Sequence, residues 1–137
     1  MQTLIGETAA KESGLKSGEI KELLTISKKA AIEGGAVLMK NYGKINKINN
    51  KGRIGDLVTN ADIESENVII KFLNDSTPNI SVFAEESGQK GLKTDLYWCI
   101  DPLDGTTNYA HGYPFFATSI GLCWNDLPIL GAITIPF

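Results

Sequence analysis

The longest amphipathic stretch of the chain runs from residue 19 to about residue 41. Its apolar positions recur at steps of three to four residues, which predicts a helix. These positions are Ile20, Leu23, Leu24, Ala31, Leu38 and Tyr42. Gly43 is typical of a helix end. Gly34 and Gly35 lie inside the stretch, and each costs about 1 kcal/mol relative to alanine. We therefore expect a close packing contact at this pair.

A second helix is predicted from residue 60 to about residue 74. Thr59 or Asn60 can cap its start, and Pro78 marks the loop beyond it. Asp62 lies near the start, where the helix dipole favours an acidic side chain. On the sequence alone, this structural role is preferred to a catalytic role for Asp62.

Apolar runs at other places predict strands. They cover residues 56–59, 80–84, 96–100, 115–123 and 129–135, and residues 124–128 are typical of a hairpin connection. Cys99 and Cys123 fall within two of these runs and lack Cys-x-x-Cys spacing. We expect both to be small buried side chains of the core rather than metal ligands or a disulfide.

The 137 residues suffice for one domain with a core. A net charge of −3 gives no reason to expect a nucleic acid polymer or a membrane surface as partner. No apolar run approaches the roughly 20 residues that span a bilayer. Residues 1–18 show no sustained periodicity and no targeting signal, so a mobile leader and a cytoplasmic protein are predicted.

Acidic residues follow two of the predicted strands. Glu85 and Glu86 come after residues 80–84, while Asp101 and Asp104 come after residues 96–100. Carboxylate and carbonyl oxygens suit Mg²⁺, and two such ions can activate water and stabilise a leaving oxygen. A short helix beginning at Thr106 would present N–H groups that suit phosphate. The pattern predicts metal-assisted hydrolysis of a phosphate monoester.

Other interpretations of these acids can be weighed by spacing. An EF-hand would need ligands where the chain has Leu103 and Gly105. A phosphatase with an aspartyl nucleophile would place its aspartates two apart, whereas Asp101 and Asp104 are three apart. An ordinary Asp-Pro and Asp-Gly turn, with Glu85-Glu86 as surface charge, stays open as an alternative.

Three ordered motifs resemble those of the inositol monophosphatase family, the lithium-sensitive, magnesium-dependent sugar phosphatases. They are Asp56-Leu57-Val58-Thr59-Asn60-Ala61-Asp62, Ala84-Glu85-Glu86-Ser87 and Asp101-Pro102-Leu103-Asp104-Gly105-Thr106-Thr107-Asn108. The resemblance covers residues 20 to 137. It implies that residues 19–137 form the N-terminal, metal-binding half of the layered αβαβα fold, an α+β arrangement with two long helices packed on a largely antiparallel sheet.

The resemblance also implies a set of metal ligands. Glu85, Asp101 and the Leu103 carbonyl would bind a first Mg²⁺, and Asp101 with Asp104 would contribute to a second. Because it would bind the first ion, Glu85 is also implied to be a catalytic residue.

Further residues would bind the substrate and activate water. Gly105 and Thr106 would give backbone N–H groups to the phosphate, with Asp104 beside them. Thr106 paired with Asp62 would orient the attacking water. Lys51 matches a lysine near the active site of the family, although a solvated loop explains the other basic residues of 40–53.

Length is the main departure from the family. Its members run about twice as far, and their second half brings a further aspartate ligand and most of the residues that select the sugar. The chain is therefore expected to be part of an inositol monophosphatase-like enzyme acting on a small phosphate ester. A catalytically silent remnant or association module, and a homodimer, stay open as alternatives.

Overall fold

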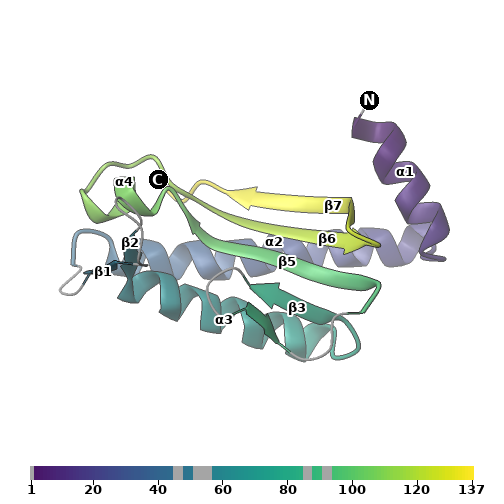
Figure 1. Ribbon diagram of the computed structural model, residues 1–137, viewed down its shortest axis with the longest axis horizontal. Helices are drawn as coiled ribbons and strands as arrows, with labels where there is room; N and C mark the ends of the chain where they lie inside the picture. Colours follow the sequence, from purple (N-terminus) through teal and green to yellow (C-terminus); the bar gives the residue numbers. More distant parts are fainter. Residues whose placement is uncertain (1, 45–47, 51–56, 85–87, 91–93) are drawn as a thin grey trace.

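The computed structural model describes residues 2–44, 48–50, 57–84, 88–90 and 94–137. Within these residues the main sheet has five strands in the order β4-β3-β5-β6-β7 (Figure 1). Its strands are β3 (Ser81–Ala84), β4 (Gly88–Lys90), β5 (Leu96–Asp104), β6 (Ala117–Trp124) and β7 (Leu127–Thr134). Only β3 and β5 pair in parallel, and the other neighbours are antiparallel. The predicted largely antiparallel sheet is confirmed.

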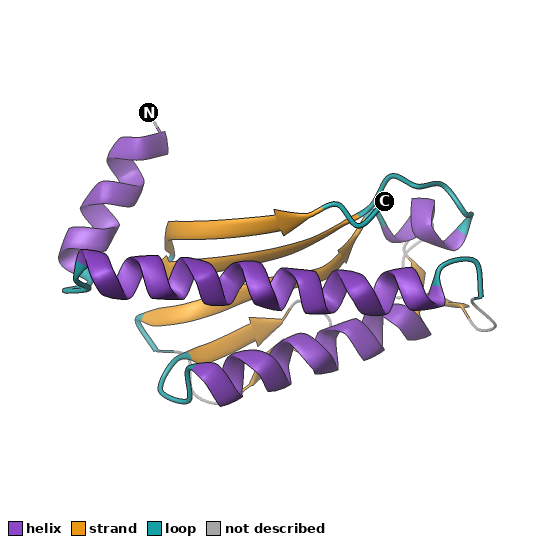
Figure 2. Cartoon of the chain, turned by 180° about the vertical axis from the view of Figure 1, so that it is seen from behind, coloured by secondary structure: helices purple, strands orange, loops and turns teal. Residues whose placement is uncertain are grey.

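Both long helices lie on one face of this sheet (Figure 2). They are α2 (Ser17–Asn41) and α3 (Asn60–Ser76), close to the predicted bounds. A small antiparallel pair, β1 (Ile48–Asn50) and β2 (Leu57–Thr59), precedes α3. The core between helices and sheet includes Leu23, Ile69, Leu73, Val82, Trp98, Ile100, Ile120 and Leu122.

Gly34 and Gly35 allow α2 to approach its neighbours closely. A Cβ at Gly34 would lie 2.5 Å from Ile69 Cδ1 in α3, and one at Gly35 would lie 3.1 Å from Thr134 Cγ2 in β7. The Ser65 hydroxyl donates to the Gly34 carbonyl at 3.0 Å. The close packing contact predicted at this pair is confirmed.

The second face of the sheet is not covered by α2 or α3. Phe83 is 38% exposed and Ile133 is 70% exposed, and Cys99 is also exposed. Because side chains alternate between the two faces of a strand, Cys99 points away from the helices while Trp98 and Ile100 point toward them. The expectation that Cys99 is buried was therefore wrong, and Cys123 is only half-buried.

An additional helix, α1 (Gln2–Glu12), lies against β7 and buries Ala9. It occupies part of the segment 1–18, where no regular structure was expected; the mobility of that segment stays a prediction. A short helix follows β5 and is described with the site. None of the helices in the described ranges has the length and apolar character to cross a membrane.

Candidate active site

Strand β5 continues through the acidic motif instead of ending before it. Asp101 pairs with Ser119 and Asp104 pairs with Ala117, so β5 carries one extra residue between these pairs. The Thr118 hydroxyl donates to the Pro102 carbonyl at 2.9 Å inside this irregularity. The segment from Asp101 to Asp104, which was expected to follow the strand, is therefore a β-bulge within it, and such a bulge changes the direction of side chains while the chain stays in the sheet.

The bulge gives the residues of the motif different surroundings. Asp101 is half-buried and Asp104 is exposed, whereas Pro102 and Leu103 are buried. Leu103 belongs to a second core cluster, which also contains Leu38, Ala61, Tyr109 and Phe116. Both carboxylates thus stay accessible while the backbone between them is anchored.

Gly105 makes the turn out of β5. Its φ is +84°, in the left-handed region that favours glycine, and a Cβ there would lie 2.7 Å from the Phe115 carbonyl oxygen. The short helix α4 (Thr106–Ala110) follows at once. The Thr106 hydroxyl donates to the Leu103 carbonyl at 3.1 Å, so the turn folds back on the end of β5.

Asp62 lies in the first turn of α3 and is only 1% exposed. An acid that merely favoured the helix dipole would not need burial. The preceding residue, Ala61, packs in the same cluster as Leu103, and α4 lies against β2, the strand that leads into α3 (Figure 1). The structure therefore brings the Asp62 motif next to the motif of Asp101 and Asp104.

Helix α3 carries a second buried acid, which the sequence did not lead us to predict. Glu66 is 4% exposed, and its Oε2 has no hydrogen-bond partner within the described parts of the chain. It lies one helical turn after Asp62, in line with Ile69 and Leu73 of the core. That spacing was the available signal, because Glu66 occupies a position on the sheet-facing stripe.

Two predicted site residues, Glu85 and Lys51, lie outside the described residues. Among the residues that are described, no group of three or more His, Cys, Asp or Glu side chains could hold a metal ion. The donors present are the carboxylates of Asp101 and Asp104 and the carbonyl of Leu103. An all-oxygen set with accessible carboxylates fits a hard cation such as Mg²⁺.

A pocket of about 380 Å³ opens beside the bulge. Its lining combines the polar residues Asp104 and Asn108 with apolar residues of the α4–β6 connection and the chain end. The full lining is Asp104, Gly105, Asn108, Pro114, Phe115, Phe116, Ala117 and Ile135. The Asn108 amide donates to the Phe115 carbonyl at 3.0 Å across this region.

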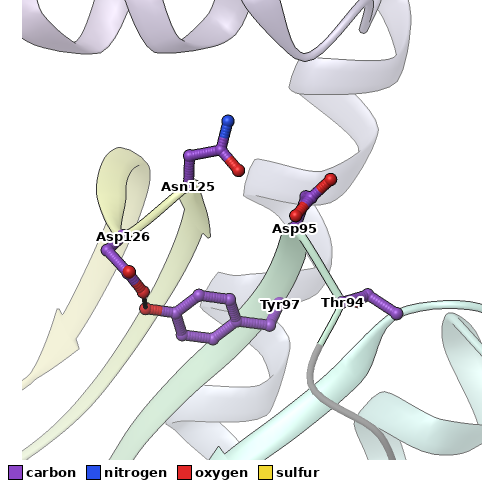
Figure 3. A pocket seen from close by; sticks show the side chains of 5 residues that line it. All are labelled: Thr94, Asp95, Tyr97, Asn125 and Asp126. Atoms are coloured by element: carbon purple, nitrogen blue, oxygen red, sulfur yellow. Dashed lines mark hydrogen bonds between the residues drawn. The ribbon is translucent and has the colours of Figure 1, made fainter.

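Another pocket, of about 120 Å³, lies at the opposite end of β5 (Figure 3). The Tyr97 hydroxyl donates to Asp126 Oδ1 at 2.8 Å there. Burial, followed by the hydrogen bond to Asp126, raises the pKa of Tyr97 well above its usual range. Tyr97 is seven residues from Asp104, which corresponds to about 23 Å along a strand, so this pocket is separate from the candidate active site.

Helices on one face of a mixed sheet, with acids around the end of its central strand, define a layered α+β fold of the sugar-phosphatase class. Comparison with known sequences and structures identifies the group within that class. The chain belongs to the inositol monophosphatase family, a family of phosphatases whose sequence profile matches residues 19–137.

Relatives of this family resemble nearly the whole chain. An inositol-1-monophosphatase of Synechocystis sp. is 40% identical over 131 residues, covering 95% of this chain and 46% of the relative. A fructose-1,6-bisphosphatase/inositol-1-monophosphatase of Aquifex aeolicus is 43% identical over 124 residues, covering 86% and 45%. The chain thus spans about half the length of these relatives, as the sequence analysis expected.

The solved structure of an inositol monophosphatase from Anabaena (Nostoc) sp. has the same fold. It superposes with a TM-score of 0.71 at 39% identity and covers 86% of this chain and 41% of that structure. The predicted α+β fold class is confirmed by this match.

Proposed function

We propose that the protein to which this chain belongs hydrolyses a small phosphate monoester with the help of Mg²⁺. Membership of a phosphatase family supports the reaction class. The inositol monophosphates and related sugar phosphates are the proposed substrates, since the named relatives act on such compounds. Lithium sensitivity and a cytoplasmic location belong to the same proposal.

One observation carries the proposal most directly. The cluster that contains Leu103 and Ala61 holds two motifs together that are about 40 residues apart in the sequence. The buried Asp62 adjoins Ala61, and the accessible Asp104 adjoins Leu103, so this cluster supports a common role for the two motifs. Acids with a purely structural role on a helix surface would not need the two motifs to lie together.

The proposed ligands of Mg²⁺ are Asp101, Asp104, the Leu103 carbonyl and Glu85. When bound, the ions would lower the pKa of a water molecule and neutralise charge on the phosphate. The residues of the chain would do the rest. Gly105 and Thr106 would orient the phosphate through backbone N–H groups, and Lys51 would add a positive charge nearby.

Thr106 and Asp62 are proposed to activate water. In the structure the Thr106 hydroxyl donates to the Leu103 carbonyl. With that carbonyl engaged as a ligand, the hydroxyl could donate to Asp62 and accept from the attacking water instead. The buried Asp62 carboxylate would then receive the proton through Thr106.

Asp104→Asn tests the proposal in the complete protein. Phosphate release from inositol monophosphate should fall by at least a hundredfold, since an anionic carboxylate ligand is replaced by a neutral amide. Asp95→Asn is a matched control, because Asp95 is exposed at the far end of β5. Normal turnover by Asp104→Asn would show that the role given to Asp104 is wrong.

A second candidate function is that of a catalytically silent association module. The exposed sheet face with Phe83 and Ile133 favours this function. We propose that this face binds a polypeptide equivalent to the part of the relatives that the chain does not match. A homodimer is the other open arrangement. Magnesium-dependent release of phosphate by the purified 137-residue chain alone would defeat this candidate.

A further inference from the structure

Three aromatic rings connect the end of α2 to the short helix α4. Tyr42 follows the last residue of α2, Tyr109 belongs to α4, and Phe116 precedes β6. The ring centroids of Tyr42 and Tyr109 are 5.6 Å apart, and those of Tyr109 and Phe116 are 4.9 Å apart. Edge-on packing of this kind fixes ring orientation as well as distance.

The Tyr109 hydroxyl bonds to a carbonyl that α2 leaves open. It donates to the Leu38 carbonyl at 2.6 Å in a buried position. Leu38 is among the last four residues of α2, whose carbonyls lack a partner inside the helix. The Tyr42 N–H, four residues further on, bonds to Met39 instead at 3.3 Å. The phenol of α4 therefore caps the end of α2.

Tyr42 makes a reciprocal bond in the opposite direction. Its hydroxyl donates to the Gly112 carbonyl at 2.5 Å, two residues beyond α4. The Gly112 N–H in turn donates to the Tyr109 carbonyl at 3.2 Å. Each helix thus gives one phenol to the backbone of the other segment, and the two bonds restrain α4 and its exit.

This restraint reaches the turn of the candidate active site. The Tyr109 N–H donates to the Gly105 carbonyl at 3.0 Å, and the Tyr109 ring packs in one cluster with Leu103 and Ala61. Burial, followed by charge interactions with Glu64 and Tyr42, raises the pKa of Tyr109 to about 12. The phenol consequently stays a donor throughout the physiological pH range.

We propose that Tyr42 and Tyr109 are positioning residues, which hold Gly105 and Thr106 in register with Asp62 through the end of α2. The functional part of this inference rests on the proposed phosphatase activity. A purely structural role would instead stabilise the fold as a whole without any special effect on residues 104–112.

Tyr109→Phe and Tyr42→Phe test the inference, because they keep the ring and remove only the hydroxyl. Tyr97→Phe is the matched control, since it removes a phenol bond to Asp126 at the far end of β5 (Figure 3). Hydrogen exchange of the 137-residue chain should be roughly fivefold to tenfold faster at residues 104–112 in the first two variants. The control should leave exchange there unchanged.

The complete protein supplies the functional readout. We expect kcat for phosphate release to fall roughly tenfold in Tyr109→Phe with little change in KM, while Tyr97→Phe retains wild-type kcat. Equal exchange and equal kcat in the Tyr109 and Tyr97 variants would overturn the inference. If the wild type releases no phosphate, the proposed function fails, but the exchange comparison still decides whether the two phenols hold this turn.

Discussion

At the scale of the residue, Gly105 lies at a position where the backbone tolerates little change. A side chain there meets two obstacles: a φ of +84° and the Phe115 carbonyl oxygen 2.7 Å from a Cβ. Gly105→Ala should lower the free energy of unfolding by about 2–4 kcal/mol. Urea denaturation of the purified chain measures this loss.

Gly112→Ala provides the control for that experiment. Gly112 has a φ of +76°, but no heavy atom lies within 4 Å of the point that an alanine Cβ would occupy. Only the conformational cost of about 1–2 kcal/mol should therefore appear. Equal losses at the two glycines would show that contact with Phe115 does not restrict Gly105.

Tyr109 should also make stability depend on pH in the alkaline range. Its pKa is about 12 in the folded chain and near 10 when unfolded, so the unfolded chain releases the proton first. The contribution to stability is complete below pH 10 and is lost as the pH rises toward 12. Unfolding measured at pH 8 to 11.5 should show a smaller decline in Tyr109→Phe than in the wild type.

The surroundings of the candidate site residues could not be predicted from the sequence. Asp62 fits a first-turn acid on the sequence alone, whereas in the structure it is buried and its neighbour Ala61 packs in one cluster with Leu103. Glu66 was missed because a lone Glu in a helix is usually a surface residue. The contact between the segments of Ala61 and Leu103 joins parts of the chain that are distant in the sequence, and no local pattern predicts it.

At the scale of the element, the packing of α2 on α3 depends on Gly34. An alanine Cβ would approach Ile69 Cδ1 to 2.5 Å and Ser65 Oγ to 3.0 Å in a filled core. Gly34→Ala should therefore lower the free energy of unfolding by about 1–3 kcal/mol, even though alanine favours helix. Thermal and urea unfolding measure the change.

Gly18→Ala, in the first turn of the same helix, is the companion variant. No atom lies within 4 Å of its Cβ position, so stability should rise by about 0.4–1 kcal/mol. A gain at both glycines would contradict the tight contact between α2 and α3.

Helix periodicity located α2 and α3 to within two residues at each end, because each helix buries a regular stripe. The extent of β5 was not predicted. Its continuation through Pro102 to Asp104 depends on pairing with β6 across a bulge, and a Pro-Gly-rich motif on its own favours a turn.

At the scale of the whole molecule, one face of the sheet carries α2 and α3, and exposed apolar side chains lie on the other face. Ile133→Thr on the exposed face should change the stability of the isolated chain by less than about 0.5 kcal/mol. Leu122→Ala on the helix face, at a fully buried position, should cost about 2–5 kcal/mol.

A loss above about 1 kcal/mol for Ile133→Thr would mean that this face is already covered in the isolated chain. Sedimentation at several concentrations would then distinguish a homodimer from a monomer. The sequence predicted the α+β class, but the exposed apolar side chains of the second face follow only from the arrangement of α2 and α3 on one side (Figure 2).

Because Cys99 is exposed on this face, a thiol reagent can show whether the face is free or covered. Cys99 lies on the central strand, while Cys123 on β6 is only half-buried on the same face. Alkylation by iodoacetamide should therefore modify Cys99 faster in the isolated chain. A polypeptide that binds to this face of the sheet should slow the alkylation of Cys99. The rate of alkylation therefore measures whether the face is covered.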